Sequence, residues 1–211
     1  MSEVLRLTER VAAALATRIL SGTWPENHKF PADADLCAEF AVSRTVIREA
    51  LRLLGAKGLI MAVPRRGTHV ALREKWALWD KDVLQWLTSS ADGINKYDLS
   101  GDALDMRLAL EPTLAALAAA RADDSANTAL QESLRALQQT NGHEAEMVYL
   151  KAFYSAAGND FAIAALPLAQ FALKHRAAAP PLEAYQRLTA AIAQKDGVAA
   201  RQAAVQALLT A

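Results

Sequence analysis

The chain has 211 residues, a length that suits one large domain or two small ones. Apolar residues make up 53% of it and glycine and proline are few, which favours helices and excludes a disordered or collagen-like chain. The single cysteine, Cys37, excludes an internal disulfide framework and a cysteine-rich zinc module. No apolar run approaches the ~18 residues of a bilayer-spanning helix, so we expect no membrane segment and a cytoplasmic location.

The net charge of zero hides a division along the chain. Residues 1–75 carry 12 Lys/Arg against 8 Asp/Glu, whereas residues 76–211 carry 11 against 15. A basic front and an acidic rear suggest two units with different partners, and a polyanion is the candidate partner of the front. We expect one domain over residues 1–71, a linker over 72–80 and a second domain over 81–211.

Three helices are predicted in the front domain. Apolar residues at helical spacing predict a first helix that ends near Ser21. We expect Asp33 to cap a short second helix and Ser43 to cap a third one, which runs to about Lys57 with Gly58 as its stop.

A β-hairpin is predicted next. Two β-prone runs, 59–63 and 68–71, flank the sequence Pro64-Arg65-Arg66-Gly67, which is typical of a tight turn.

The rear half is predicted to be an all-α antiparallel bundle with short loops. From Leu84 onward the pattern is almost wholly helical. We expect helices at about 81–88, 101–121, 126–139, 144–157, 160–175, 182–194 and 196–209.

The third helix separates an apolar stripe from a basic row. The stripe is formed by Ile47, Ala50, Leu51 and Leu54, and the row by Arg44, Arg48 and Arg52 beside Thr45. The planar fork of arginine can donate to both major-groove acceptors of a guanine. Three arginines on a helix can also be a solvated face, but the short helix before them and the basic hairpin after them favour DNA recognition.

The front domain resembles the winged helix-turn-helix of the GntR family of bacterial transcription regulators. The resemblance covers about 65 residues and is carried by Phe30-Pro31-Ala32-Asp33, Leu36-Cys37, Val42-Ser43-Arg44-Thr45-Val46-Ile47-Arg48-Glu49-Ala50-Leu51, Leu54, Gly58-Leu59-Ile60 and Pro64-Arg65-Arg66-Gly67-Thr68-His69-Val70. It implies a homodimer that binds double-stranded operator DNA and associates with the nucleoid. The expected DNA contacts are Arg44, Thr45, Arg48, Arg52, Arg65, Arg66, Gly67 and Thr68.

Two positions depart from the family pattern. Ala34 stands on the second helix where the family usually has an arginine. Ala41 stands in the turn where glycine is common, and if that site needs a positive φ the alanine costs about 1 kcal/mol.

The rear domain resembles the FCD effector domain of the FadR-like branch of the same family, and residues 76–86 are similar to the linker of galactonate-type sugar-acid regulators. The matching parts are Arg107, Leu110-Glu111-Pro112, Ala115, Ala118-Ala119, Tyr149, Phe153, Ala156, Gly158-Asn159, Ala191-Ile192, Asp196 and Ala200. The resemblance implies a small organic acid as effector, with Arg107, Glu146, Tyr154 and Tyr185 as candidate contacts. Arg107 is either a carboxylate clamp or the partner of Glu111 or Asp105 in a pair that serves only the helix surface.

Many FCD domains bind a divalent metal through one carboxylate and three histidines. Here those positions hold Glu146, Leu150, Tyr185 and Ala207, so we expect no metal and no other cofactor. The segment 159–185 is also shorter than is usual in such domains.

Three functions follow from these patterns. The first is a ligand-responsive repressor of a catabolic operon, and the second is a DNA-binding dimer whose helical domain has lost ligand response and serves dimerisation or protein contact. The third is an enzyme, against which the chain shows no catalytic triad order, no glycine-rich phosphate loop and no HExxH sequence. We expect no catalytic residues.

Overall fold

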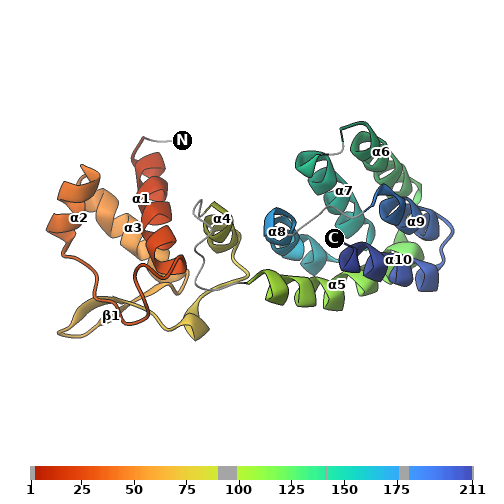
Figure 1. Ribbon diagram of the computed structural model, residues 1–211. Coiled ribbons are helices and arrows are strands. Elements are labelled where there is room, and N and C mark those ends of the chain that lie inside the picture. Colours follow the sequence, from red (N-terminus) through yellow and green to blue (C-terminus); the bar gives the residue numbers. More distant parts are fainter. Residues whose placement is uncertain (1–2, 90–98, 141, 176–180, 211) are drawn as a thin grey trace. The chain divides into compact units, whose positions relative to one another are not determined.

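The computed structural model describes residues 3–89, 99–140, 142–175 and 181–210, and its contacts divide the chain into two compact units between Asp98 and Leu99. Figure 1 shows the β-hairpin in the first unit and a second unit built of helices. The predicted fold class, a winged helix-turn-helix followed by an all-α domain, is confirmed. The division falls later than the expected boundary at residue 81, because the helix expected to open the rear domain packs against the first unit.

The core of the first unit is built around α1 (Glu3–Leu20). Its apolar residues recur every three or four positions, so one face is buried while the other stays polar. α1 packs against α3 (Arg44–Ala56) and α4 (Lys81–Ser89). The buried apolar residues of this helix and of α4 are Val11, Ala12, Leu15, Ala16, Ile19, Leu20, Val83, Leu84, Trp86 and Leu87.

The second helix, α2 (Asp33–Phe40), begins one residue earlier than expected. Ala32 holds the extended backbone of an N-cap (φ −66°, ψ 152°) and offers no side-chain hydrogen bond. The prediction that Asp33 caps this helix is therefore wrong. Asp33 already lies in the first turn, where its charge faces the positive end of the helix dipole.

A tight turn joins α2 to α3. Ala41 adopts the left-handed conformation (φ 51°, ψ 44°), so the condition under which alanine is strained at this site is met. Ser43 caps α3 as predicted, because its hydroxyl accepts a hydrogen bond from the backbone N–H of Val46 at 3.4 Å.

The hairpin consists of β1 (Ile60–Val63) and β2 (Gly67–Val70), paired antiparallel with Ile60 opposite Val70 and Val63 opposite Gly67. The predicted strands are confirmed to within one residue. Gly67 has a φ of +90°, which glycine adopts without steric cost. Residues 27–30 run along the other edge of β2, with Lys29 opposite His69.

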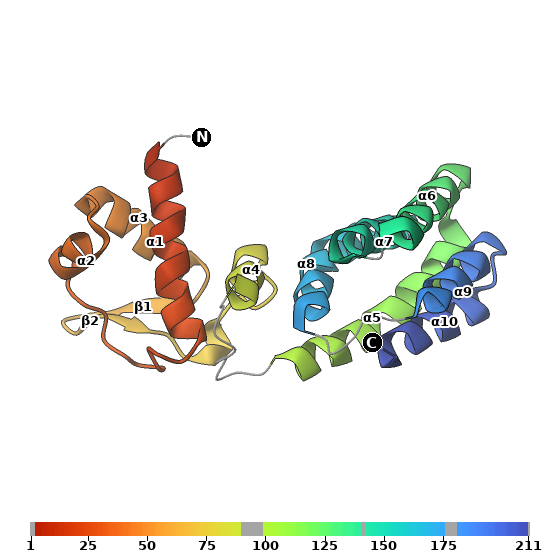
Figure 2. The ribbon, with the colours of Figure 1, turned by 45° about the horizontal axis from the view of Figure 1, so that its top comes forward.

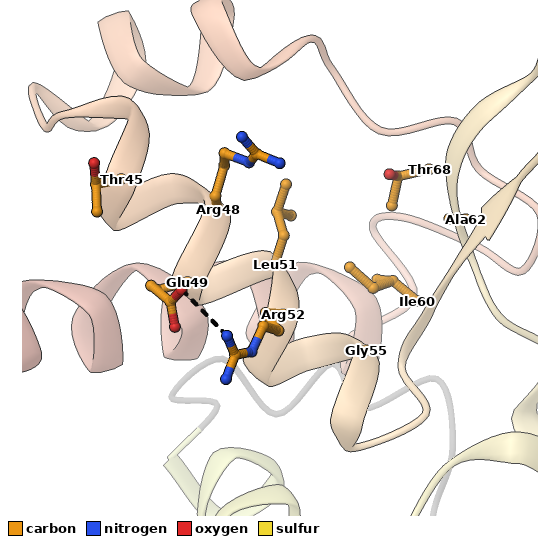
Figure 3. Close-up of a pocket in the computed structure, with 9 residues that line it drawn as sticks. All are labelled: Thr45, Arg48, Glu49, Leu51, Arg52, Gly55, Ile60, Ala62 and Thr68. Carbon is orange, nitrogen blue, oxygen red and sulfur yellow. Dashed lines mark ion pairs between the residues drawn. The ribbon is translucent and has the colours of Figure 1, made fainter.

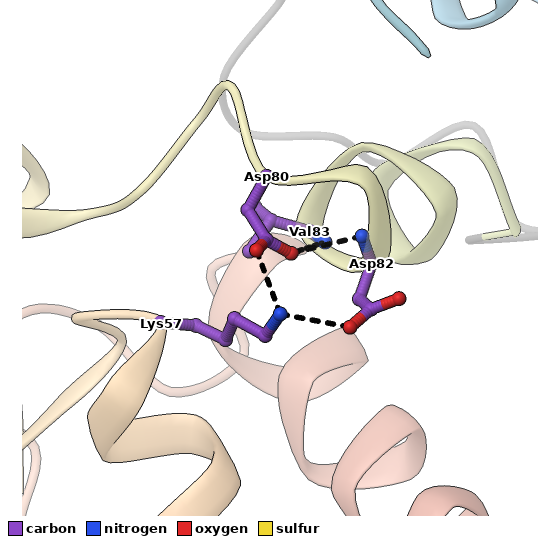
Figure 4. A network of polar contacts seen from close by, with 4 residues as sticks. All are labelled: Lys57, Asp80, Asp82 and Val83. Carbon is purple, nitrogen blue, oxygen red and sulfur yellow. Dashed lines mark hydrogen bonds and ion pairs between the residues drawn. The ribbon is translucent and has the colours of Figure 1, made fainter. Parts of the chain in front are cut away.

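Residues 72–80, expected to be a linker, form a folded part of the first unit. They contain the short 3₁₀ helix η1 (Arg73–Lys75) and lie against the end of α3, where Gly58 has a φ of +70°. The backbone N–H of Ala77 donates to the carbonyl of Lys57 at 3.0 Å. The Lys57 ammonium contacts Asp80 at 2.7 Å and Asp82 at 2.8 Å, at the start of α4 (Figure 4).

The second unit is an alanine-rich bundle whose helices start and end within about two residues of the predicted positions. Its longest helix, α5, packs against α7, α8, α9 and α10, while α6 packs against α7 and α9 (Figure 2). The bounds are α5 (Ser100–Arg121), α6 (Asp124–Thr140), α7 (His143–Ala156), α8 (Asp160–His175), α9 (Leu182–Ala193) and α10 (Gly197–Leu209). None of the helices in the described ranges is long and apolar enough to span a bilayer.

Candidate nucleic-acid interface

α3 divides its surface between the protein core and solvent. Its buried residues are Val46, Ile47, Ala50 and Leu54, and these anchor the helix on α1. The exposed residues include all four that the sequence predicted to contact DNA, Arg44, Thr45, Arg48 and Arg52. The basic row is therefore free to face a partner. Leu51, predicted to lie in the buried stripe, is only half-buried, and Val46 occupies the core in its place.

A groove of about 570 Å³ separates α3 from the hairpin. Figure 3 shows Arg48 and Leu51 extending from α3 toward the strands that carry Ile60, Ala62 and Thr68. Leu51, Ile60 and Ala62 give the groove apolar surface, while its other lining residues add charged and hydroxyl groups. The full lining is Thr45, Arg48, Glu49, Leu51, Arg52, Gly55, Ile60, Ala62 and Thr68.

The turn of the hairpin supplies the rest of the predicted contacts. Arg65, Arg66 and Gly67 are all exposed at the tip, and Thr68 is half-buried where β2 borders the groove. The structure thus brings Thr45, Arg48, Arg52 and Thr68 around one groove. Arg44 is exposed at the start of α3 and does not line it.

Most of these arginines lack an internal counter-charge. Arg52 lies 3.6 Å from Glu49, and both side chains are largely exposed, so this pair contributes little to stability. Within the parts of the chain that the structure describes, no carboxylate pairs with Arg44, Arg48, Arg65 or Arg66. Unpaired guanidinium groups on one face are suited to bind phosphate oxygens and guanine edges.

Several residues of this face were not foreseen. Glu49, Leu51, Ile60 and Ala62 line the groove, but their types and spacing resemble those of ordinary surface or core positions. Only the packing of the hairpin against α3 reveals them. A helix of this shape fits the major groove of B-DNA, while a basic hairpin beside it can reach the phosphates or the adjacent minor groove.

Residues 7–70 match the family model of bacterial regulatory proteins of the gntR family, and residues 102–210 match that of the FCD domain. The chain belongs to the GntR family. It is a DNA-binding transcriptional regulator with an FCD domain. The relatives that it resembles are named as transcriptional regulators and not as enzymes.

Two proteins of Escherichia coli (strain K12) resemble this GntR regulator along almost their whole length. It is 34% identical to the galactonate operon transcriptional repressor, over 95% of this chain and 93% of that protein. It is 31% identical to the HTH-type transcriptional regulator YieP, over 94% and 90%.

Two solved structures share the fold. Streptococcus agalactiae GntR has a TM-score of 0.52 at 24% identity, covering 96% of this chain and 97% of that one. Lar of Listeria monocytogenes has a TM-score of 0.58 at 14% identity, covering 96% and 93%.

The interior of the second unit holds the predicted effector residues in a closed polar network. Arg107 donates to both oxygens of Glu111, at 2.6 and 3.3 Å, and both side chains are about 95% buried. The hydroxyl of Tyr154 donates to the same carboxylate at 2.8 Å. Of the alternatives left open for Arg107, the pairing with Glu111 is realised, but inside the bundle rather than on a helix surface.

The ionisation of this network is set by burial and by its one carboxylate–guanidinium pair. Burial works to lower the pKa of Arg107, but the charge and hydrogen bond of Glu111 outweigh it and raise that pKa above its usual range. Burial, and then the Glu111 charge, raise the pKa of Tyr154 well above its usual range. Arg107 is therefore charged and Tyr154 is a neutral phenol at all physiological pH values.

A second polar pair lies nearby, where Tyr185 donates a hydrogen bond to the buried carboxylate of Glu146. The cavity beside Arg107 is lined by Leu150, Tyr185 and Ala207 among others, and its volume is about 10 Å³. That is room for about one water molecule. No organic acid fits this cavity unless side chains move.

These residues do not fit the metal site of the FCD domains that bind one. Glu146 is a carboxylate, but Leu150 and Ala207 offer no donor atom, and the hydroxyl of Tyr185 donates a hydrogen bond to Glu146. Among the described residues, no three His, Cys, Asp or Glu side chains gather closely enough to hold a metal ion. One carboxylate and one phenol, with no imidazole, are a poor donor set for a transition metal.

Proposed function

We propose that this chain is a homodimeric, operator-binding repressor of a catabolic operon for a sugar acid or another small carboxylate. One observation carries the DNA-binding part: α3 and the tip of the hairpin, on the two sides of one groove, both present exposed arginines, and among the described residues only Arg52 of these has a carboxylate partner, Glu49. Likeness to the galactonate operon transcriptional repressor over 95% of the chain supports the class of genes. The protein acts by binding and catalyses no reaction.

Two-fold symmetry would explain how a small interface reads DNA specifically. One recognition helix contacts only a few base pairs, whereas two of them, related by a dyad, read two half-sites about 34–36 Å apart. We therefore expect a pseudo-palindromic operator. Size-exclusion chromatography with light scattering and a binding-site selection with the full-length protein test the dimer and the symmetry of its site.

Arg48 and Arg65 are assigned different tasks at this interface. Arg48 lines the groove on α3, so we assign it to a guanine edge, whereas Arg65 lies at the exposed tip of the hairpin and is assigned to phosphate. Replacing Arg48 by alanine should cost about 1–3 kcal/mol and relax the preference at one operator position. Replacing Arg65 should weaken binding to all sequences and lower the salt dependence by about one unit of slope.

The control for both variants is Arg10→Ala, which removes an exposed arginine from α1 outside the groove. It should leave affinity and sequence preference unchanged. If the Arg48 and Arg65 variants bind the selected operator as tightly as the parent protein, the assignment of this face to DNA is refuted.

The repressor model requires an effector that binds one dimer geometry better than another. We expect an aldonic, uronic or dicarboxylic acid to bind near Arg107, because a buried guanidinium can clamp a carboxylate. Such an acid should raise the melting temperature of the second unit and release the protein from its operator. Galactonate is the first compound to test, given the likeness to the galactonate operon repressor.

A second candidate function is a DNA-binding dimer whose helical domain no longer responds to a ligand. A specific observation favours it: Glu111 already occupies the guanidinium of Arg107, and the cavity beside the pair has a volume of about 10 Å³. Under this model none of the acids changes the melting temperature or the operator affinity. A single acid that does both excludes it.

A further inference from the structure

The backbone beside β2 holds Lys29 next to the tip of the hairpin. Residues 27–30 run antiparallel to β2 through three backbone hydrogen bonds: Phe30 to the carbonyl of Thr68 at 2.9 Å, Val70 to that of His28 at 2.9 Å, and Asn27 to that of Val70 at 3.0 Å. These bonds fix the position of the Lys29 α-carbon relative to the hairpin. The segment thus lies along the free edge of β2, beside the two-stranded sheet.

The Lys29 side chain extends along the open side of Gly67. A β-carbon built on Gly67 would have the Cε atom of Lys29 as its nearest neighbour, at 3.8 Å, so the ammonium lies one bond beyond that point. Lys29 is exposed, and no carboxylate of the described residues forms an ion pair with it. Its charge is therefore available beside the exposed Arg65 and Arg66.

The glycine gives this cluster a particular shape. Because Gly67 has no side chain and is itself exposed, nothing at that position stands between the cationic groups and an approaching surface. His69, opposite Lys29, is buried, and its Nδ1 forms a hydrogen bond with the carbonyl of Gly67 at 3.2 Å, which steadies the tip. The result is a bare backbone patch with positive charges on the hairpin turn, at Arg65 and Arg66, and on the segment beside β2, at Lys29.

We propose that Lys29 is a further contact of the operator interface and binds a backbone phosphate together with Arg65 and Arg66. This inference rests on the proposed DNA-binding face and extends it from α3 and the hairpin to the segment between α1 and α2. An ammonium is a compact point charge without the fork that reads a guanine edge. Lys29 therefore contributes to affinity on every sequence and does not select bases.

The test measures the affinity of the full-length protein for two duplexes, one chosen by binding-site selection and one of the same length with scrambled sequence, over a series of salt concentrations. Lys29→Gln keeps most of the stem beside Gly67 but removes the charge. Lys29→Arg keeps the charge. The matched control is Lys81→Ala, which removes an exposed lysine from the start of α4 in the same unit.

Loss of one phosphate contact lowers the slope of log affinity against log salt by about 0.9. We expect this change for Lys29→Gln, with affinity reduced about eightfold at ~0.1 M salt on both duplexes alike. Lys29→Arg should bind like the parent protein, and Lys81→Ala should keep the parent slope. All variants should keep the parent melting temperature, since the exposed charge supports no internal contact.

Three results would overturn the inference. One is that Lys29→Gln keeps the parent's slope of log affinity against log salt while the parent protein binds DNA with a steep slope. That result would refute the role of Lys29 but not the proposed DNA-binding function. Another is a loss confined to the selected duplex, because that would make Lys29 a reader of bases. The third is failure of the parent protein to bind either duplex, which would refute the proposed function as well.

Discussion

Replacing Lys57 by methionine should destabilise the first unit by about 2–3 kcal/mol. The Lys57 ammonium makes two short contacts, at 2.7 Å to Asp80 and 2.8 Å to Asp82, and its side chain is only 14% exposed. Asp80 also caps α4, because its other carboxylate oxygen accepts from the N–H groups of Asp82 and Val83. Methionine keeps the apolar stem but leaves two neighbouring carboxylates without their cation.

The magnitude follows from partial burial. A hydrogen bond to a charged group contributes about 1.5–3 kcal/mol, and two of them share one lysine here. Removing one partner of a fully buried pair costs about 3–5 kcal/mol. Asp80 and Asp82 are 27% and 33% exposed, so water reaches both carboxylates and the expected cost lies below that range.

The chain offers a selective probe for this measurement. All four tryptophans, Trp24, Trp76, Trp79 and Trp86, lie in the first unit, so tryptophan fluorescence during urea unfolding reports that unit. A double-mutant cycle with Asp80→Asn isolates the pair, because asparagine caps a helix as well as aspartate does. We expect a coupling energy of about 1–2 kcal/mol. Free energies that add to within ~0.3 kcal/mol would refute the reasoning.

The same contacts predict how the pair responds to pH. Burial alone would lower the pKa of Lys57, but its hydrogen bonds to Asp80 and Asp82 raise it above the ordinary 10.5. Burial alone would raise the pKa of Asp80, but the Lys57 hydrogen bond brings it below the ordinary 3.8. The pair therefore contributes its full stability between pH 3.8 and pH 10.5, the ordinary pKa values of the two groups. This contribution is lost as the pH falls through the lowered pKa of Asp80 or rises through the raised pKa of Lys57.

Two backbone predictions concern the same unit. A β-carbon on Gly58 would lie 1.9 Å from the carbonyl oxygen of Lys75, so Gly58→Ala should lower the free energy of unfolding in urea by at least ~3 kcal/mol. The control is Gly101→Ala in the second unit. A β-carbon there has nothing within 4 Å, so this change should alter the stability of the second unit by less than about 1 kcal/mol. A stable Gly58 variant would contradict the close approach. Ala41→Gly should stabilise the first unit by up to ~1 kcal/mol, because Ala41 has a φ of 51°, and a loss of stability would show that this turn carries no strain.

Local chemistry in the sequence was enough to place most elements. The hydroxyl of Ser43 fixes the start of α3, and Pro64 and Gly67 bound the hairpin turn, because caps and turns depend on a few adjacent residues. The partner of α4 could not be predicted. A helical apolar pattern shows that one face is buried but does not show against what, and in this protein that face packs on α1.

The same limit applies to the functional face. The arginine row of α3 could be read from its spacing, since it depends on one helix alone. Leu51 borders the groove and Lys29 lies beside Gly67 only because separate segments pack together. In the second unit, spacing allowed an Arg107–Glu111 pair, but the expectation that such a pair lies on the helix surface is wrong, because both side chains are buried inside the bundle.

That burial leads to a prediction that separates the two models of the effector domain. Glu111→Ala removes the only carboxylate among the described residues that pairs with Arg107, so it should leave a buried cation and a void of about carboxylate size, at a cost of about 3–5 kcal/mol. Acetate or propionate should then refill the void and restore part of the melting temperature of the second unit, followed by far-UV circular dichroism. Tyr154→Phe is the control, because it loses one hydrogen bond to Glu111 but keeps the ion pair.

The effect of the same acids on the parent protein shows what the rescue of Glu111→Ala means for function. If acetate stabilises Glu111→Ala but no acid stabilises the parent, Glu111 itself satisfies Arg107 and the domain has no room for an effector there. If a sugar acid stabilises both proteins, the bundle opens and the acid competes with Glu111 for the guanidinium. If no acid stabilises either protein, Arg107 does not bind exogenous carboxylates. In Glu111→Ala the buried guanidinium would then be compensated by water or by another group of the protein, because an uncompensated buried charge is costly.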